Sequence, residues 1–201
     1  LVYKGVFSPK YFNGPRIFTY NFPLVQDEEV LEIGCGTGIT GLYLAKNGAK
    51  KVVLVDINEA AVKNARENAA RNHIDNIETR ISNVFSSLQE QETFDTIYWN
   101  MPFIPAPSEY RYQSIVEKAL FDPGYRLLKH FLEEAPLYLK NHGRILVGWG
   151  SDENQEFSDT LKLKQLCTLN GYSIKLVAEK TSREINPVKF QLYELRRKNA
   201  I

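Results

Sequence analysis

Long hydrophobic runs are missing from this sequence of 201 residues. No apolar stretch approaches the roughly 20 residues that a helix needs to cross a bilayer, so a membrane protein is not expected. The N-terminus has no basic region followed by an apolar segment and a small-residue cleavage site, which favours a cytoplasmic protein without a secretory signal. The first residue is Leu1 rather than methionine, so native residues can precede it.

The sequence also has few cysteines and almost no net charge. Cys35 and Cys167 have neither the spacing of a disulfide framework nor that of a metal site, so we expect two reduced, buried thiols and no bound metal. The formal net charge of +1 gives no overall attraction to nucleic acid, and the basic cluster at residues 196–198 is expected to be a solvated terminus. The composition, 43% hydrophobic and 24% charged, is typical of one globular domain.

A glycine-rich turn at residues 34–38 follows an apolar run that contains one acid, Glu32. Glycines adopt positive φ and let a ligand approach the backbone closely, and the helix that follows presents unpaired N–H groups to the same place. The turn therefore predicts a site for a ligand with a carboxylate or a phosphate. Because Gly36, Gly38 and Gly41 also have the spacing of a dinucleotide fingerprint, a nicotinamide dinucleotide stays possible here.

A second apolar run, KVVLVD at residues 51–56, ends in Asp56 and predicts a second buried parallel strand. An acid at the end of the second strand of a βαβ unit lies where a ribose binds, and its carboxylate can accept hydrogen bonds from both ribose hydroxyls. Asp56 thus indicates a nucleoside ligand of either class. Its alternative role is to cap the helix expected at residues 58–72.

The run at residues 30–38, VLEIGCGTG, resembles motif I of the class I S-adenosylmethionine-dependent methyltransferases: an apolar strand, Asp or Glu, an aliphatic residue, then Gly-x-Gly-x-Gly. The resemblance implies that the glycine turn packs against the methionine part of S-adenosylmethionine. The cofactor-binding residues that it implies in this run are Glu32, Gly34, Cys35, Gly36 and Gly38. It also implies binding of the cofactor by Asp56 with its neighbour Ile57, and by Asn83, which stands where the family usually has an adenine-binding Asp; a plain turn asparagine is the alternative.

The fourth expected strand ends in Asn100-Met101-Pro102-Phe103, which resembles motif IV of the amino-methyltransferases, Asn or Asp, Pro, Pro, then Tyr or Phe. A planar nitrogen has its lone pair in conjugation, so its N–H groups must be held and its lone pair turned to the methyl group. The resemblance implies that Asn100, which also borders the cofactor, and the Met101 carbonyl accept those hydrogens, that Pro102 stiffens the turn and that Phe103 stacks. Met101 departs from the usual proline, which leaves open a different acceptor, a weakened enzyme or an inactive cofactor-binding partner; a plain loop start is the alternative.

The residues after Phe103 look most like the release-factor-type protein glutamine N5-methyltransferases, with Ile104-Pro105, later Ala119-Leu120, then an aspartate-and-glycine turn and a helix. This resemblance implies a protein glutamine as the methyl acceptor. An adenine-N6 or guanine-N2 group of RNA or DNA and a small-molecule amine remain alternatives. Residues 104–123 are too rich in proline for regular structure, and we expect a substrate-binding loop there.

Residues 1–28 are rich in aromatic residues and are interrupted by prolines, which predicts short elements packed on the body as a cap. The segment is either satellite core or a cover over the cofactor. Within this segment, the run Gly5-Val6-Phe7-Ser8-Pro9 resembles the entry segment of the small methyltransferase domain. The resemblance implies that the segment lies near the cofactor.

The remaining pattern predicts alternating strands and helices. Strands are expected within residues 30–38, 51–56, 77–81, 94–103, 144–149, 173–178 and 188–196. Helices are expected at residues 39–47, 58–72, 124–140 and 153–170. With the resemblance, this order implies an α/β, Rossmann-like class I methyltransferase fold at residues 29–201: a seven-stranded, mostly parallel sheet with an antiparallel last strand and helices on both faces. The pattern leaves the oligomeric state open.

Overall fold

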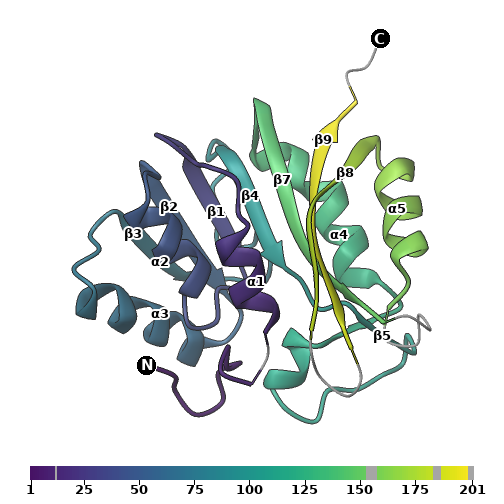
Figure 1. Ribbon diagram of the computed structural model, residues 1–201, viewed down its shortest axis with the longest axis horizontal. Coiled ribbons are helices and arrows are strands. Elements are labelled where there is room, and N and C mark those ends of the chain that lie inside the picture. The colour runs from purple at the N-terminus through teal and green to yellow at the C-terminus, as the bar shows by residue number, and fades with distance from the viewer. Residues whose placement is uncertain (12, 153–157, 183–186, 199–201) are drawn as a thin grey trace.

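A seven-stranded sheet forms the centre of the computed structural model, which describes residues 1–11, 13–152, 158–182 and 187–198 (Figure 1). In spatial order its strands are β3 (Ile77–Ile81), β2 (Lys51–Asp56), β1 (Glu29–Ile33), β4 (Phe94–Asn100), β7 (Leu139–Ser151), β9 (Lys189–Arg197) and β8 (Tyr172–Thr181). β9 runs antiparallel to both of its neighbours, and the pairs from β3 to β7 are parallel. The expected sheet with an antiparallel last strand is confirmed.

Side chains alternate between the two faces of the sheet, and helices cover both faces (Figure 1). The helices are α1 (Gly14–Tyr20), α2 (Ile39–Lys46), α3 (Glu59–Arg71), α4 (Arg126–Glu134) and α5 (Thr160–Leu169). In β1, Leu31 and Ile33 face the core under α4 and α5, whereas Val30 faces the core under α2 and α3. Strands buried on both faces read as continuous apolar runs, which is why β1, β2 and β4 were visible in the sequence.

The helix expected at residues 124–140 is shorter than predicted. α4 ends at Glu134, a 3-10 turn η2 (Ala135–Tyr138) follows, and β7 begins at Leu139, which pairs with Phe94. Pro136 explains the stop, because it lacks the N–H of an α-helix and its ring collides with the preceding turn. Residues 141–143, predicted to end the helix, therefore belong to a strand.

Residues 104–123 also differ from the prediction, because they contain regular structure. β5 (Ile104–Ala106) pairs in parallel with β6 (Phe121–Pro123), and a 3-10 turn η1 (Val116–Ala119) lies between them. Proline is compatible with such a ribbon, since both strands are edges and an edge can lose one donor. The buried carboxylate of Asp122 accepts from the backbone N–H groups of Leu127 and Leu128, which joins the ribbon to α4.

The last predicted helix, at residues 153–170, is α5, which begins at Thr160. The Asp159 side chain caps it by accepting from the Lys162 N–H at 3.0 Å. Residues 153–157 of the prediction lie outside the described part of the chain. In that described part, no helix is long and apolar enough to cross a membrane. Both cysteines are free and buried, as expected.

The aromatic N-terminal segment is partly core. The α1 helix packs on α2 and β9, and Phe18 lies in a cluster with Tyr98 and Leu192. Phe22 meets the Tyr98 ring edge-on at 5.0 Å. These rings cover the part of the sheet that α2 and α3 leave open.

We predict that two leucines of α5 differ sharply in their contribution to stability. Leu163 is 0% exposed and Leu161 is 67% exposed. Leu163→Ala should lower the free energy of unfolding by about 2 to 5 kcal/mol, because it leaves a cavity in the core. Leu161→Ala is the matched control and should change it by no more than about 0.5 kcal/mol. Chemical denaturation measures both, and equal losses would contradict this packing of α5.

Candidate functional site

A cavity of about 240 Å³ lies at the carboxyl ends of β1, β2, β3 and β4. Ligands of open α/β sheets bind at this end, where the strand order reverses, and here the reversal falls between β1 and β4. Segments that contribute to the wall include the glycine turn, residues 56–58, residues 82–84, the end of β4, the N-terminal arm and the loop from Tyr112 to Ala119. The cavity thus collects segments that are far apart in the sequence.

The glycine turn has left-handed backbone at Gly34, Gly36 and Gly38, with φ of 63°, 55° and 80°. A Cβ on Gly36 would meet no atom within 4 Å, whereas one on Gly38 would lie 3.1 Å from the Cβ of Ala65 in α3. Gly36 therefore keeps a ligand wall free, and Gly38 allows α3 to pack. Gly34, Cys35 and Gly36 line the cavity, but Gly38 does not.

Glu32 lies under this turn and is 4% exposed. Its Oε2 atom accepts from the Gly41 N–H at 2.7 Å, in the first turn of α2. A Cβ on Gly41 would lie 2.5 Å from that oxygen, so the close approach requires glycine. Because a first-turn N–H of α2 is already taken, a pyrophosphate has fewer donors here, which favours a ligand other than a dinucleotide. Burial raises the pKa of Glu32 to about 8.

Asp56 borders the cavity at the end of β2. One carboxylate oxygen accepts from the Gly36 N–H at 2.9 Å and the other from the Asn58 N–H at 2.8 Å. Burial raises the pKa of Asp56, although these backbone hydrogen bonds oppose the shift. The cap of α3 is the Asn58 side chain, which accepts from Ala60 N–H at 3.0 Å. Each Asp56 oxygen keeps a further lone pair with which to accept from a ligand.

Ile57 and Asn83, which are predicted to contact the cofactor, are exposed residues that line the cavity. Only some of the motif IV residues line the cavity. Asn100 and Pro102 line the cavity, but Met101 is 1% exposed within the core.

Phe103, the last residue of motif IV, is not among the lining residues. Its ring packs 6.2 Å from that of Trp149 and lies against Gly150, where a Cβ would come within 2.5 Å of it. The conformation described here therefore does not bring Phe103 into the cavity.

Several residues of the wall were not predicted. Trp99 lines the cavity, and its Nε1 lies 3.1 Å from the position of a Cβ on Gly34, so this indole adjoins the glycine turn. The loop that supplies Tyr112 is organised by Glu117, which accepts from the Tyr110 hydroxyl at 3.0 Å and the Gln113 N–H at 2.8 Å. The place of Trp99 directly before Asn100 was a usable signal. The segment 104–123, expected to be a substrate-binding loop, does border the cavity, but no local pattern singled out Tyr112 or Glu117 within it.

The N-terminal arm, residues 1–9, reaches the cavity with Gly5, Phe7 and Pro9. It is held on α3, where Asn64 accepts from the Tyr3 N–H at 2.8 Å. Asn68 donates both to the Leu1 carbonyl at 3.0 Å and to the Thr37 carbonyl of the glycine turn at 2.9 Å. The N-terminal segment is therefore core at α1 and cavity wall in the arm.

This fold and this cavity, with a glycine turn, an acid after β2 and an asparagine at the end of β4, define a class I methyltransferase type of domain. The model of the methyltransferase small domain matches residues 1–174, and the chain belongs to that family. A Methanocaldococcus jannaschii protein named "Putative protein N5-glutamine methyltransferase" is 40% identical over 126 residues, which are 61% of this chain and 62% of that protein. The release factor glutamine methyltransferase of Shewanella oneidensis is 32% identical over 159 residues, 76% of this chain and 53% of that protein.

Among solved structures, the ribosomal protein L11 methylase of Lactobacillus delbrueckii subsp. bulgaricus matches with a TM-score of 0.65 at 20% identity. The match covers 96% of this chain and 82% of that one, and it shows the shared fold. The chain spans only about half to three fifths of the length of the two curated relatives named above.

Glu32 predicts a pH dependence of stability. Its pKa is about 8 in the folded protein and about 4.3 in an unfolded chain, so its protonation stabilises the fold fully below pH 4.3, and this is lost as pH rises through 8. Relative to the wild type, Glu32→Gln should therefore gain free energy of unfolding from pH 5 to 8, with a slope approaching about 1.4 kcal/mol per pH unit. Denaturant titrations across that range measure the slope.

Glu29→Gln is the matched control. Hydrogen bonds from Lys140 and Lys50 lower the pKa of Glu29, so its contribution is lost only as pH falls below the ordinary range of a glutamate. This variant should show a flat difference from the wild type between pH 5 and 8. A flat difference for Glu32→Gln as well would contradict the raised pKa of Glu32.

Proposed function

We propose that this chain binds S-adenosylmethionine and transfers its methyl group to a planar nitrogen, with a protein glutamine as the favoured acceptor. The observation that carries this proposal is the meeting of Asn100 with the glycine turn and Asp56 around one cavity. A donor site and an acceptor-holding group are needed within reach of each other, and methyl transfer is chiefly a matter of positioning.

The cofactor would lie along the glycine turn with its methionine part. Gly36 offers a wall without a side chain, Asp56 keeps lone pairs for the ribose hydroxyls, and Asn83 can accept from the adenine amino group. Glu32 acts through the backbone, since its oxygen holds the Gly41 N–H. When bound, S-adenosylmethionine supplies an electrophilic methyl group on its sulfonium.

The acceptor nitrogen would be held at Asn100. Within the described ranges, the side-chain amide of Asn100 makes no hydrogen bond to another residue. Its oxygen is therefore available to accept a hydrogen bond from the N–H of the methyl acceptor. The carbonyl of Met101 would take the second hydrogen, because any residue supplies that group. Held by these two oxygens, the nitrogen would turn its lone pair toward the methyl group that the cofactor supplies, and the proton displaced by methylation would pass to water. A stacking role for Phe103 would require its ring to leave Gly150.

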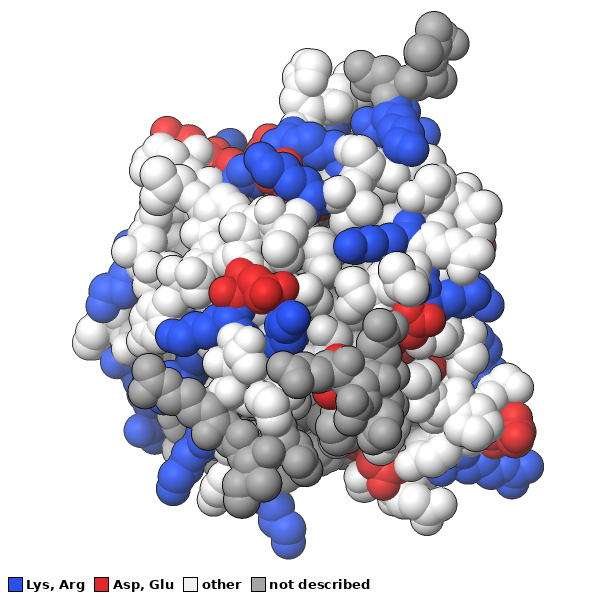
Figure 2. Space-filling model, turned by 45° about the vertical axis from the view of Figure 1, so that its right-hand side comes forward, with Lys and Arg blue, Asp and Glu red and all other residues white. Residues whose placement is uncertain are grey.

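Protein glutamine is favoured as the acceptor because of the residues after Phe103 and the names of the relatives described above. Electrostatics adds to this preference. The net charge is +1, and on the face in Figure 2 the described basic side chains are interspersed with acidic and uncharged ones. A nucleic-acid substrate would call for a more continuous basic surface.

Two measurements test this assignment. Calorimetry should show binding of S-adenosylmethionine and not of NAD; tight NAD binding alone would overturn the proposal in favour of an oxidoreductase. Cell extract should then be incubated with this protein and radioactive S-adenosylmethionine. Protease should release the label from the macromolecular fraction, whereas nuclease should leave it there. The reverse result would make a nucleobase the acceptor.

Asn100→Ala should retain cofactor binding but lose methyl transfer by about 100-fold or more, because the acceptor nitrogen is no longer oriented. Asn72→Ala is the matched control, since Asn72 is an exposed residue at the end of α3 that does not line the cavity. Calorimetry with S-adenosylhomocysteine and an assay of labelled product separate binding from turnover. Unchanged turnover in Asn100→Ala would remove Asn100 from the mechanism.

A further inference from the structure

Residues 82–92, in the loop between β3 and β4, contribute Ser82, Asn83 and Val84 to the cavity wall. Val84 has φ of 54° and is 5% exposed. A β-branched residue in the left-handed region is strained, and such a conformation persists only where the surroundings impose it. The contacts that impose it therefore also shape the wall that faces the cofactor.

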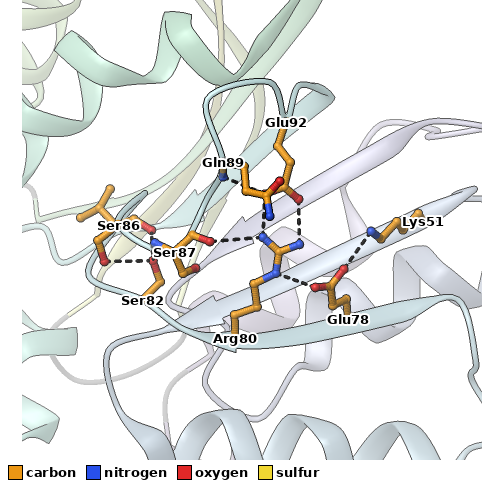
Figure 3. Close-up of polar contacts among 9 residues, drawn as sticks. Lys51, Glu78, Arg80, Ser82, Ser86, Ser87, Gln89 and Glu92 are labelled. Atoms are coloured by element: carbon orange, nitrogen blue, oxygen red, sulfur yellow. Dashed lines mark hydrogen bonds and ion pairs between the residues drawn. The ribbon is translucent and has the colours of Figure 1, made fainter.

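Serine hydroxyls hold the first part of this loop (Figure 3). Ser82 Oγ donates to the Val84 carbonyl at 2.9 Å and accepts from the Ser87 N–H at 3.0 Å. The Asn83 N–H donates to Ser86 Oγ at 2.9 Å. These hydrogen bonds close the turn around Val84. They do not hold the part of the loop after Ser87, which needs a second anchor.

Arg80 supplies that second anchor from the edge strand β3 (Figure 3). Its guanidinium makes two hydrogen bonds of 2.7 Å to the two carboxylate oxygens of Glu92, and it also donates to the Ser87 carbonyl at 3.4 Å. Glu92 additionally accepts from the Gln89 N–H at 3.0 Å. One arginine thus bonds to two points of the loop at once.

This ion pair differs from a typical surface pair. The side chains of Arg80 and Glu92 are 21% and 23% exposed, and their fork-to-fork geometry fixes both groups. Hydrogen bonds from Arg80 lower the pKa of Glu92. Glu78 binds the remaining guanidinium edge through Oε1 at 2.6 Å. Its other oxygen, Oε2, pairs with the more exposed Lys51 at 2.8 Å.

We propose that Arg80 and Glu92 are positioning residues of the cofactor site: their pairing holds residues 82–92 so that Asn83 and Val84 face the cavity. Neither residue lines the cavity itself. The inference rests on the proposed function, since it assigns the task of the pair to binding of the cofactor. The chain of contacts runs from Arg80 to Ser87, from Ser87 to Ser82, and from Ser82 to Val84.

The test uses calorimetric titration with S-adenosylhomocysteine. Arg80→Met and Glu92→Gln should each raise the Kd about 10-fold while the number of binding sites per chain stays unchanged. The double variant should be no weaker than either single one, because both changes remove the same anchor. Lys51→Met is the matched control: it breaks the ion pair to Glu78 on the same edge, leaves the loop contacts intact, and should change the Kd by less than about 2-fold.

The outcomes separate the two claims. A merely structural role would reduce the number of sites, through unfolded protein, at an unchanged Kd, and this result would overturn the inference. An unchanged Kd in Arg80→Met, or an equal loss in Lys51→Met, would also overturn it. Wild-type protein that fails to bind S-adenosylhomocysteine would refute the proposed function itself.

Discussion

The hydrogen bond between the buried Glu32 carboxyl and the Gly41 N–H is the contact on which the geometry of the site depends. It fixes the start of α2 against the end of β1, so the glycine turn between them has both ends set. Asp56 then fixes the middle of the turn through Gly36. Two acids from neighbouring strands thus hold one loop, and glycine at position 41 is the condition for the first contact.

The strands of the first half could be predicted from the sequence because each is buried on both faces. β2 was expected at residues 51–56 and has those bounds, since its apolar run needs no distant information. The prediction of no regular structure in residues 104–123 was wrong for the opposite reason. β5 and β6 are three residues each, too short for a periodic pattern, and each exists only because it pairs with the other. Pro136 was visible in the sequence, but the pairing of Leu139 with Phe94 was not.

The candidate site divides along the same line. Residues whose role is set by the local chain, such as Gly36, Asp56 and Asn100, were found from short motifs and do line the cavity. Phe103 does not line the cavity, because its ring packs against Gly150, a residue of β7 without a side chain that leaves room for the ring. Local spacing also cannot separate a glycine needed for a ligand from one needed for packing. Gly36 and Gly38 look alike in the motif, yet only Gly38 is crowded by α3.

Parts of the cavity wall are held by polar side chains that the motifs do not contain. Asn68 ties the N-terminal arm to the glycine turn, and Arg80 ties residues 82–92 to the edge of the sheet. Such anchors are selected by geometry: an amide with two donors can serve two carbonyls, and a guanidinium can serve a carboxylate and a carbonyl together. A motif search finds the groups that face a ligand, whereas the precision with which they face it resides in these contacts behind the wall.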